Sequence, residues 1–452
     1  MTTAPRPTPG GSSPGLSFLD SSVGRDAVQL AREALRDHPD DPLRARKALD
    51  VLCPDATAEQ ARAALAQASL QLRAASRFGT DADDLLWSDA GLAAASRPGC
   101  TRRRAQRLLA AGVNEVVDLT CGLGLDAIGF AAAGLTVLGV ERDEAVAELA
   151  RRNVAQRGLD DRVTILVGSC QEAVSWEHLP RQAWFVDPAR RDPGRVRADG
   201  SHIRLDDAER WSPPWSWVKA QIGVPQVLLA KAAPGIEHRL LTPSDDGDES
   251  IDTEVEWVSE DGQLLEAAPL WRRQHGAMGC VPGGVRRRAV VLGRSPIELG
   301  SGTAAAMIGQ EGPAAPPEPG EVLLDPDPAI VRAGLVAELA RAIGGRLVDE
   351  HLAYLVVPDP LPQSWRAAAR RQWRVLWVGR YRPEAMREAC VDHGIGQVDV
   401  TGRGRTLTED RVRRDLRLRG RPHLQRRGTV ITMGMGPRRN TIAVLGGIVT
   451  EA

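Results

Sequence analysis

The residues best suited to chemistry stand at the end of a short apolar segment, where a carboxylate and two glycines follow one another. Residues 116–124 read Val-Val-Asp-Leu-Thr-Cys-Gly-Leu-Gly, so that Asp118 precedes Gly122 and Gly124, and a helical pattern begins at Asp126. This order predicts a strand, a glycine turn and a helix. In such an arrangement backbone N–H groups and one carboxylate lie close to a bound nucleotide-like cofactor.

The sign of the charge separates two classes of cofactor. The run from Gly122 to Ala127 also fits the dinucleotide fingerprint, in which a pyrophosphate lies at the helix N-terminus. Asp118 stands four residues before the first glycine and would repel a pyrophosphate. The same carboxylate would attract the sulfonium and ammonium groups of S-adenosylmethionine. The sequence therefore favours S-adenosylmethionine as the cofactor.

A second carboxylate follows the next predicted strand. Residues 136–140 form an apolar strand pattern, and Glu141 comes directly after it. A carboxylate there can accept hydrogen bonds from both ribose hydroxyls of an adenosine, each worth roughly 1.5–3 kcal/mol. The alternative is an acid in a solvated turn, but the spacing from the glycine turn favours the ribose role.

Elements that alternate along the chain predict the fold around these residues. A helix is expected over 143–157, and further strands are expected at 163–167, 183–187 and 225–230. Five strands alternating with helices predict an α/β fold with a doubly wound, Rossmann-like parallel sheet. Residues 254–270 read as an antiparallel hairpin that would complete this sheet.

The stretch from Asp118 to Asp126, with Glu141-Arg142-Asp143, resembles class I S-adenosylmethionine-dependent methyltransferases over residues 110–295. Within this superfamily it resembles the trimethylguanosine-synthase-like RNA guanine-N2 methyltransferases. It is even more similar to bacterial proteins that join such a domain to a C-terminal THUMP-like module. The second similarity extends over residues 372–448. From the motifs and the resemblance, the predicted cofactor-binding residues are Asp118, Cys121, Gly122, Gly124, Asp126, Glu141, Arg142, Ser169 and Cys170.

One departure from that family concerns the methyl acceptor. Its base N-methyltransferases carry Asp/Asn-Pro-Pro-aromatic after the fourth strand, and two oxygens of this motif hold the target amine. This chain has Asp187-Pro188-Ala189-Arg190-Arg191. The resemblance implies that Asp187 and Pro188 hold the amine and are the catalytic pair, whereas the stacking ring is absent. Arg190 and Arg191 are predicted to bind substrate, by guanidinium stacking or by holding a phosphate.

Two further positions near the predicted sheet edge are open to more than one role. Gly168-Ser169-Cys170 stands where many relatives place an acid for the adenine amine, so a backbone carbonyl, Ser169 or Gln171 would take that role. Lys231 follows the fifth strand, where open α/β sheets bind ligands. It is a candidate for substrate phosphate, and the alternative is an ion pair with Asp187.

Arginine is concentrated near the C-terminus. Residues 361–452 hold 19 Arg against 8 Asp plus Glu, although the whole chain has a net charge of −1. A basic module attracts nucleic-acid phosphates, and Arg403 and Arg405 are the predicted substrate-binding residues there. The chain has only three lysines, so the alternative is an arginine-rich composition without RNA binding. Trp365 and Trp373 fit either base stacking or a core, and Trp377 fits a core.

The 452 residues exceed one ordinary core, so several domains are expected. Helical spacing before the first strand predicts a cap that could cover the cofactor or shape the substrate entrance. The favoured alternative is that these helices only pack against the sheet domain, and that Arg102 to Arg104 form the solvated start of a helix. The predicted divisions are a flexible tail (1–16), a helical region (17–108), a methyltransferase domain (109–300), a linker (301–320), a connecting helical segment (321–371) and a THUMP-like α+β domain (372–452).

Cysteine and hydropathy patterns narrow the class of protein. The six cysteines stand singly, which favours neither a metal site nor a disulfide framework. No apolar run of about 18 residues occurs, and no basic-then-apolar leader begins the chain, so we expect a cytoplasmic protein.

Two hypotheses of function follow from these patterns. In the first, the protein is an enzyme that methylates an amine nitrogen, most plausibly on an RNA base, with RNA held by the basic module. In the second, the methyltransferase fold is catalytically weak or inactive and binds RNA or protein. The altered Asp187-to-Arg190 motif keeps this second hypothesis open. Methylation of a protein or small-molecule amine is a further alternative within the enzyme class.

Overall fold

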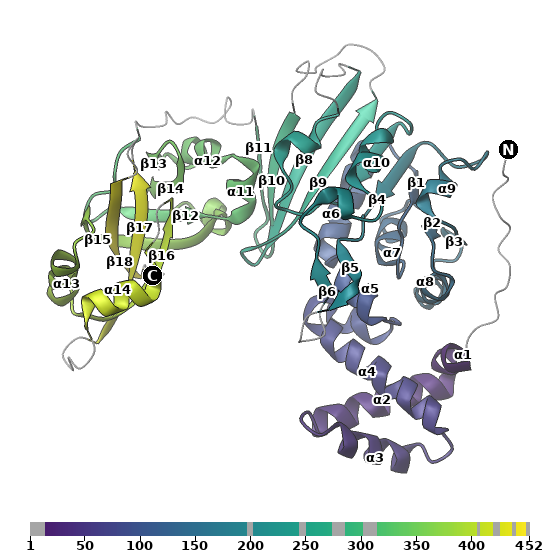
Figure 1. The fold of residues 1–452 in the computed structure, drawn as a ribbon. Coiled ribbons are helices and arrows are strands. Elements are labelled where there is room, and N and C mark those ends of the chain that lie inside the picture. The colour runs from purple at the N-terminus through teal and green to yellow at the C-terminus, as the bar shows by residue number, and fades with distance from the viewer. Residues whose placement is uncertain are drawn as a thin grey trace. The chain divides into compact units, whose positions relative to one another are not determined.

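The computed structural model of this chain describes residues 14–196, 202–243, 250–273, 285–301, 314–404, 407–418, 425–435 and 440–448. Their contacts group into two compact units. The first contains residues 1–232, 238–253 and 268–283, and the second contains residues 233–237, 254–267 and 284–452. Figure 1 labels the helices and strands of both units.

Helices form the N-terminal part of the first unit, as the sequence predicted. A capping box opens α4, in which Thr57 and Gln60 each accept a hydrogen bond from the other's backbone N–H. Small residues such as Ala64 and Ala68 line its buried face, which allows α2 to pack closely through Ala27. The helices are α1 (Pro14–Asp20), α2 (Ser22–Asp37), α3 (Pro42–Leu52), α4 (Ala58–Phe78), η1 (Gly79–Asp83), α5 (Asp89–Ala94) and α6 (Pro98–Ala110).

A parallel sheet follows in the first unit, with strands in the order β7-β4-β1-β2-β3 and antiparallel β9 beside β7. The predicted doubly wound α/β fold is therefore confirmed. The elements are β1 (Glu115–Asp118), α7 (Leu125–Ala132), β2 (Thr136–Glu141), α8 (Glu144–Gln156), β3 (Val163–Val167), α9 (Cys170–Ala173), β4 (Ala183–Val186), β5 (Arg191–Val196), β6 (His202–Arg204), η2 (Ala208–Arg210), α10 (Trp215–Ala220), β7 (Val227–Ala230), η3 (His238–Leu241), β8 (Ile251–Glu260) and β9 (Gln263–Arg273).

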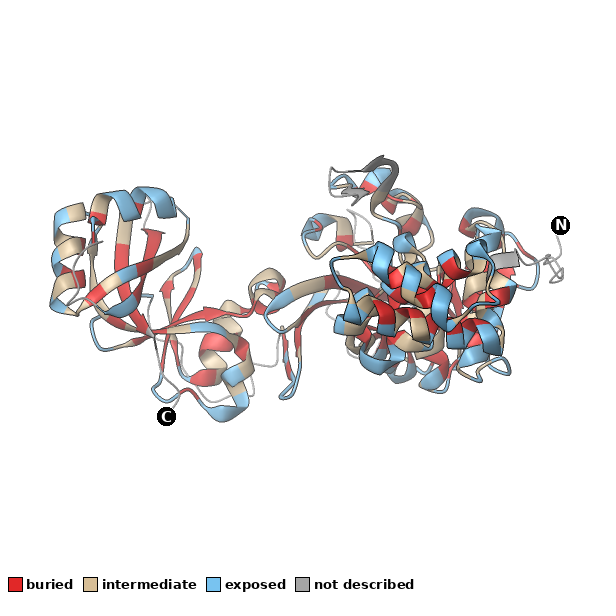
Figure 2. Ribbon diagram, turned by 90° about the horizontal axis from the view of Figure 1, so that it is seen from below, coloured by how far each residue is buried: buried red, intermediate tan, exposed pale blue. Residues whose placement is uncertain are grey.

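Apolar side chains of α6, α7 and α8 share one buried cluster with the strands. Leu108, Phe130 and Val154 belong to this cluster, together with Val116 and Phe185 of the sheet. The rings of Phe130 and Phe185 meet edge to face, with centroids 5.2 Å apart. Figure 2 shows the consequence, since buried residues follow the strands whereas exposed residues collect on the outer faces of the helices. This core holds the carboxyl ends of the strands in place.

The predicted hairpin at residues 254–270 is present as β8 and β9. Its turn consists of Asp261 and Gly262, both with positive φ (51° and 70°), as a tight two-residue hairpin requires. Residues 254–267 of this hairpin group with the second unit rather than the first. The contacts therefore divide this hairpin between two units, whereas the predicted methyltransferase domain (109–300) holds it whole, because strand patterns do not reveal which core a long strand packs against.

The second unit contains a seven-stranded sheet in the order β13-β14-β12-β15-β18-β17-β16, and β10 and β11 also belong to this unit. Its elements are β10 (Val285–Leu292), β11 (Ile297–Gly300), β12 (Val322–Pro326), α11 (Pro328–Ala333), α12 (Val336–Ile343), β13 (Arg346–Asp349), β14 (Leu352–Val357), η5 (Gln363–Ala368), β15 (Ala369–Arg380), α13 (Pro383–Asp392), β16 (Ile395–Arg403), α14 (Glu409–Leu416), β17 (Arg426–Met435) and β18 (Asn440–Ile448).

The segment 321–371, predicted to be a helical connection, contains strands as well as helices. It supplies three strands, β12, β13 and β14, to the same sheet as β15. Its helical part is also broken, because Gly334 adopts φ +68° between α11 and α12. Helices α11 and α12 do lie within the predicted helical segment, but the residues on either side of them form strands, which a local helical pattern does not reveal. Most of the predicted tail and of the predicted linker lies outside the described residues, and α1 begins at Pro14, within the last residues of that tail.

Candidate active site

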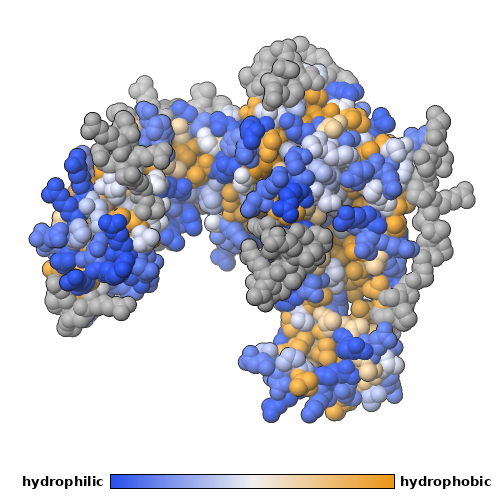
Figure 3. All heavy atoms as spheres, viewed as in Figure 1, coloured by the Kyte–Doolittle hydropathy of each residue, from blue (hydrophilic) through white to orange (hydrophobic). Residues whose placement is uncertain are grey.

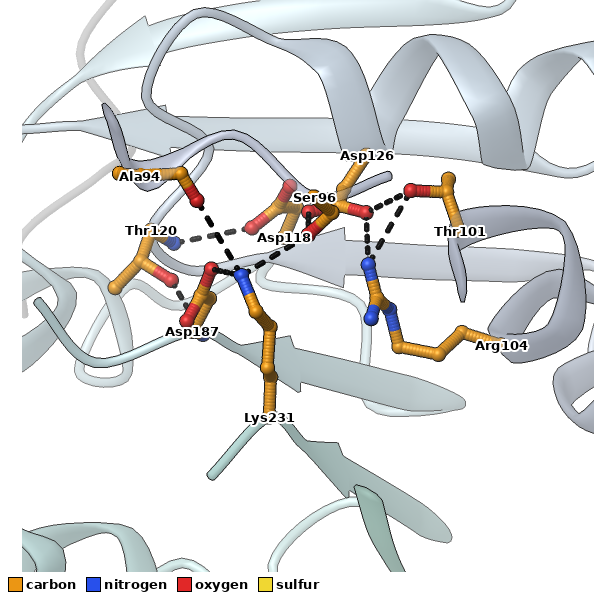
Figure 4. Close-up of polar contacts among 9 residues, drawn as sticks. All are labelled: Ala94, Ser96, Thr101, Arg104, Asp118, Thr120, Asp126, Asp187 and Lys231. Carbon is orange, nitrogen blue, oxygen red and sulfur yellow. Dashed lines mark hydrogen bonds and ion pairs between the residues drawn. The ribbon is translucent and has the colours of Figure 1, made fainter. Parts of the chain in front are cut away.

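Four charged residues follow four parallel strands of the first unit. Asp118 ends β1 and Glu141 ends β2, while Asp187 and Lys231 come directly after β4 and β7. Because these strands are parallel, their carboxyl ends share one edge of the sheet. Figure 4 shows three of these residues, Asp118, Asp187 and Lys231, converging with side chains of the N-terminal helical region.

The glycine turn after β1 has the backbone that its sequence demands. Gly122 and Gly124 have φ of +53° and +78°, in the left-handed region that favours glycine. The N–H of Cys121 donates to the Val140 carbonyl at 3.0 Å, which ties the turn to β2. A Cβ added at Gly122 would meet no atom within 4 Å. The turn therefore has open space beside it in which a ligand can approach the backbone.

Glu141 connects the turn to the next helix. Its two carboxylate oxygens accept hydrogen bonds from the backbone N–H of Gly122 at 3.1 Å and of Asp143 at 2.9 Å. Asp143 in turn caps α8 by accepting from two backbone N–H groups. Each oxygen of Glu141 keeps a lone pair, because a carboxylate has about four acceptor positions. This geometry fits the predicted role of holding ribose hydroxyls.

Asp118 carries an unsatisfied oxygen in the interior. The residue is 0% exposed; Oδ1 accepts from the N–H of Thr120 at 3.2 Å, and Oδ2 has no hydrogen-bond partner among the described residues. Burial, with Asp126 as the next cause, raises the pKa of Asp118 well above its usual value. A buried carboxylate oxygen without a partner fits a cationic ligand group. The residues therefore fit S-adenosylmethionine, whose ammonium and sulfonium are both positive.

Asp126, predicted to bind the cofactor, is engaged by the protein itself. It accepts hydrogen bonds from Ser96 at 3.0 Å and Thr101 at 2.6 Å, and it pairs with Arg104. Burial alone would raise the pKa of Asp126, but Arg104 and Lys231 lower it overall. These partners hold its side chain in the first turn of α7, and its predicted contact with the cofactor stays a prediction.

The partners of Asp126 were not predicted. Arg104 was interpreted as part of a solvated helix start, whereas it is 0% exposed and stacks 5.2 Å from the ring centroid of Phe185. The available signal was an arginine next to the apolar positions Ala105 and Leu108. Such a residue lies on the buried face of an amphipathic helix and requires a buried acid.

Residues 187–191 form the acceptor loop, which is predicted to hold the methyl acceptor, and hydrogen bonds fix this loop on both sides. The N–H of Asp187 donates to the Thr120 hydroxyl at 2.8 Å. Ala189 and Ser212 exchange backbone hydrogen bonds of 2.7 and 3.0 Å, and Arg142 reaches the Ser212 hydroxyl at 3.2 Å. Pro188 is buried and Ala189 is exposed. The loop is thus a fixed feature of the site.

The two arginines of this loop are half-buried and make interactions of their own. The carbonyl of Arg190 accepts from the N–H of Leu205 at 2.9 Å, and Arg191 begins β5. Their predicted contact with substrate stays a prediction.

Ser169 and Cys170 begin the short helix α9 after β3. The Ser169 hydroxyl caps this helix by accepting from the N–H of Glu172 at 3.2 Å. The Cys170 thiol lies 3.0 Å from the side-chain oxygen of Gln171, and burial raises the pKa of Cys170 to about 11. Burial also raises the pKa of Cys121. Both thiols are therefore held protonated, and their predicted contact with the cofactor would involve the backbone or the neutral side chain.

The arginines predicted to bind RNA lie in the second unit. Arg403 pairs with the buried Asp325 at 2.6 Å and lies 5.4 Å from the ring centroid of Tyr354. Its side chain thus contacts the unit's own core, and its predicted contact with RNA stays a prediction. Arg405 lies outside the described residues.

The tryptophans of this unit differ in how far they are buried. Trp373 is 4% exposed and belongs to the core, and Trp377 packs against a second cluster. Trp365 is half-buried.

The described residues contain neither a metal-ion cluster nor a membrane-spanning helix. No group of three or more His, Cys, Asp or Glu is placed to hold a metal ion. No described helix is long and apolar enough to cross a membrane.

Comparisons with known proteins agree with this geometry. The family model for RNA cap guanine-N2 methyltransferases matches residues 113–190, which include the glycine turn and Asp187. A Mycobacterium tuberculosis (strain CDC 1551) protein, described as an uncharacterized S-adenosylmethionine-dependent methyltransferase, is 28% identical over 361 residues, covering 78% of this chain and 87% of its own. The 23S rRNA (uracil(1939)-C(5))-methyltransferase RlmD of Acidithiobacillus ferrooxidans is 36% identical over 92 residues, covering 20% of this chain and 21% of its own.

Among solved structures, a methyltransferase from Porphyromonas gingivalis W83 has a similar fold along almost the whole chain. The alignment has a TM-score of 0.64 at 17% identity and covers 94% of this chain and 99% of that one. At this identity the likeness concerns the fold alone. The sequence matches and the geometry at the ends of β1 and β2 show that this chain is similar to S-adenosylmethionine-dependent methyltransferases, with S-adenosylmethionine as the cofactor.

Proposed function

We propose that this protein transfers a methyl group from S-adenosylmethionine to an amine nitrogen on an RNA base. The observation that carries the proposal is the position of Asp187 and Pro188. They follow β4 at the sheet edge that also carries Asp118 and Glu141, and the RNA cap guanine-N2 methyltransferase model ends just beyond them. S-adenosylmethionine brings an activated methyl group, so the protein's task is to bind and to orient.

Each part of the cofactor has a matching group in the first unit. The unpartnered Oδ2 of Asp118 suits the ammonium of the methionine part. Glu141 accepts the ribose hydroxyls, and the open backbone at Gly122 allows close approach. Ser169 and Gln171 lie at the start of α9, where the adenine amine would be read by a backbone carbonyl or by one of these side chains.

The acceptor amine is held by two oxygens of the loop after β4. One is a carboxylate oxygen of Asp187, and the other is the carbonyl of Pro188. Two acceptors held in this way orient an NH₂ group so that its lone pair points at the methyl carbon. The loop has no aromatic ring, and we assign stacking on the base to the guanidinium plane of Arg190.

The second unit is proposed to hold RNA by its phosphates. Between residues 361 and 435, the described residues include eleven exposed arginines and five exposed acids. Figure 3 shows strongly hydrophilic residues on the visible surface around α13 and α14. The exposed arginines are Arg366, Arg370, Arg371, Arg380, Arg382, Arg411, Arg413, Arg414, Arg417, Arg426 and Arg427.

A second candidate function is a binding module that retains the fold without efficient turnover. The departure at Ala189 and Arg190 favours it, because the proline and the aromatic ring of the related motif are both missing. An enzyme that acts on a protein or small-molecule amine is the other alternative.

Transfer of a labelled methyl group separates these functions. Purified protein is incubated with methyl-labelled S-adenosylmethionine and with RNA, protein or metabolite fractions of a cell extract. We expect label in the RNA fraction, and Asp187→Ala should lower its rate at least about hundredfold with little change in cofactor affinity. Label in another fraction would assign the acceptor there, and cofactor binding without any transfer would favour the binding module.

A further inference from the structure

Lys231 is a buried cation beside the proposed acceptor carboxylate. Its side chain is 7% exposed, and its ammonium has three N–H donors. The structure provides an acceptor for each donor: Asp187 Oδ2 at 2.6 Å, Ser96 Oγ at 3.0 Å and the Ala94 carbonyl at 3.4 Å (Figure 4). No donor is left for a substrate phosphate, so the ion-pair alternative is favoured for this residue.

Ser96 continues the chain of contacts away from Asp187. A hydroxyl has one hydrogen to donate. Ser96 accepts from Lys231 and donates to Asp126 Oδ2 at 3.0 Å, so the direction of both hydrogen bonds is determined. Thr101 and Arg104 hold the other oxygen of Asp126. The contacts therefore run without a gap from α6 to the acceptor loop.

We propose that Lys231 and Ser96 are positioning residues of the acceptor site, which hold Asp187 in the orientation that receives the amine. This inference rests on the proposed methyl transfer. Lys231 occupies Oδ2, and Oδ1 makes no hydrogen bond among the described residues, so Oδ1 is left for the acceptor. The N-terminal helical region, through Ala94 and Ser96, thus contributes directly to the acceptor side of the site.

The physical reason is the density of negative charge at this edge. Asp118, Asp126 and Asp187 lie close enough to influence one another, and in the described part of the chain Arg104 pairs with Asp126 and Lys231 with Asp187. Removing the Lys231 charge leaves Asp187 beside two other acids without its cation, and the carboxylate turns toward water instead of toward the acceptor. A displacement of about 1 Å can cost roughly a hundredfold in rate.

Lysine-selective NMR tests the contacts without any knowledge of the acceptor. The chain contains three lysines, Lys47, Lys219 and Lys231, so protein labelled at the lysine ε-carbon has three side-chain signals. Loss of one signal in Lys231→Arg assigns it. We expect that signal to shift in Asp187→Asn and in Ser96→Ala and to stay unchanged in Lys47→Met. A Lys231 signal that is insensitive to Asp187→Asn would overturn the pairing.

Kinetics test the positioning role. With methyl-labelled S-adenosylmethionine and total RNA, Lys231→Met should lower kcat about a hundredfold and change the KM for S-adenosylmethionine less than about threefold. Lys231→Arg should recover part of the loss because it keeps the charge. Lys47→Met is the matched control, since Lys47 is exposed on α3, and it should behave as wild type.

The outcomes distinguish this inference from the proposed function. Wild-type kcat in Lys231→Met, or a loss that is confined to cofactor KM, would overturn the positioning role while the methyl transfer stands. A wild-type protein that labels no RNA would overturn the proposed function, and the lysine signals would still decide whether Lys231 pairs with Asp187.

Discussion

Asp118 has a buried carboxylate oxygen that the described residues leave without a partner. Arg104 is engaged by Asp126 and Lys231 by Asp187, whereas Oδ2 of Asp118 has no partner among the described residues. Burial and neighbouring acids raise its pKa, so the protonated form is favoured while the site lacks a cation. A bound cation reverses that preference. Cofactor binding and the loss of a proton from Asp118 should therefore be linked.

This linkage predicts a pH dependence of cofactor affinity. The pKa of Asp118 is high in the free protein and falls when a cation binds, so affinity should increase as pH rises and level off above the free-protein pKa. Calorimetry in two buffers of different ionisation enthalpy should detect net proton release. Asp118→Asn should abolish the release and weaken binding at least about tenfold, roughly 1.4 kcal/mol. Glu141→Ala should weaken binding similarly but leave the proton release intact, and equal affinity in both variants would contradict the assigned roles.

Among the elements, α6 and α7 approach each other through Gly129. A Cβ added there would lie 2.2 Å from the Thr101 methyl carbon, a contact that requires something to shift. Thr101 is also the residue whose hydroxyl holds Asp126. The close approach of the two helices and the network beneath the cofactor turn therefore depend on the same pair of residues.

Gly129→Ala should thus lower the free energy of unfolding by about 1–3 kcal/mol through overpacking. Thr101→Ser keeps the hydroxyl and removes the methyl group that would clash, so the double variant should regain most of the lost stability. Chemical denaturation of the two single variants and the double variant measures the coupling. Purely additive effects would show that the helices move apart instead.

Local elements at the site were predictable from sequence, because each depends on neighbouring residues. The strand, turn and helix around Gly122, and an acid directly after β2, are encoded within a few positions. The partners of Asp126 were not, since Ser96 and Arg104 lie 30 and 22 residues away along the chain. The strand β12 was missed for the same reason, because its partners β14 and β15 both follow α11 and α12 along the chain. Contacts between residues so far apart in the sequence depend on how the chain packs in three dimensions, and local sequence patterns carry no information about that packing.

For the whole molecule, the arginine excess of the second unit predicts binding to RNA that weakens with salt. Replacing the exposed Arg371, Arg380 and Arg382 by Gln should reduce the log–log salt slope by about two, at about 0.7 for each contact with single-stranded RNA. The matched control replaces three exposed arginines of the N-terminal helices, Arg36, Arg44 and Arg62. Equal slopes in the two triple variants would mean that the arginines of the second unit reflect composition alone.

Because β8 and β9 each have residues in both units, the two units are interleaved along the polypeptide. Residues 254–267 belong to the second unit, yet residues 268–283 return to the first. On the ribosome, the first unit can complete its contacts only after part of the second has already been synthesised. No single cut in the gene releases either unit whole, so exchange of these units between proteins by simple end-to-end fusion would break both.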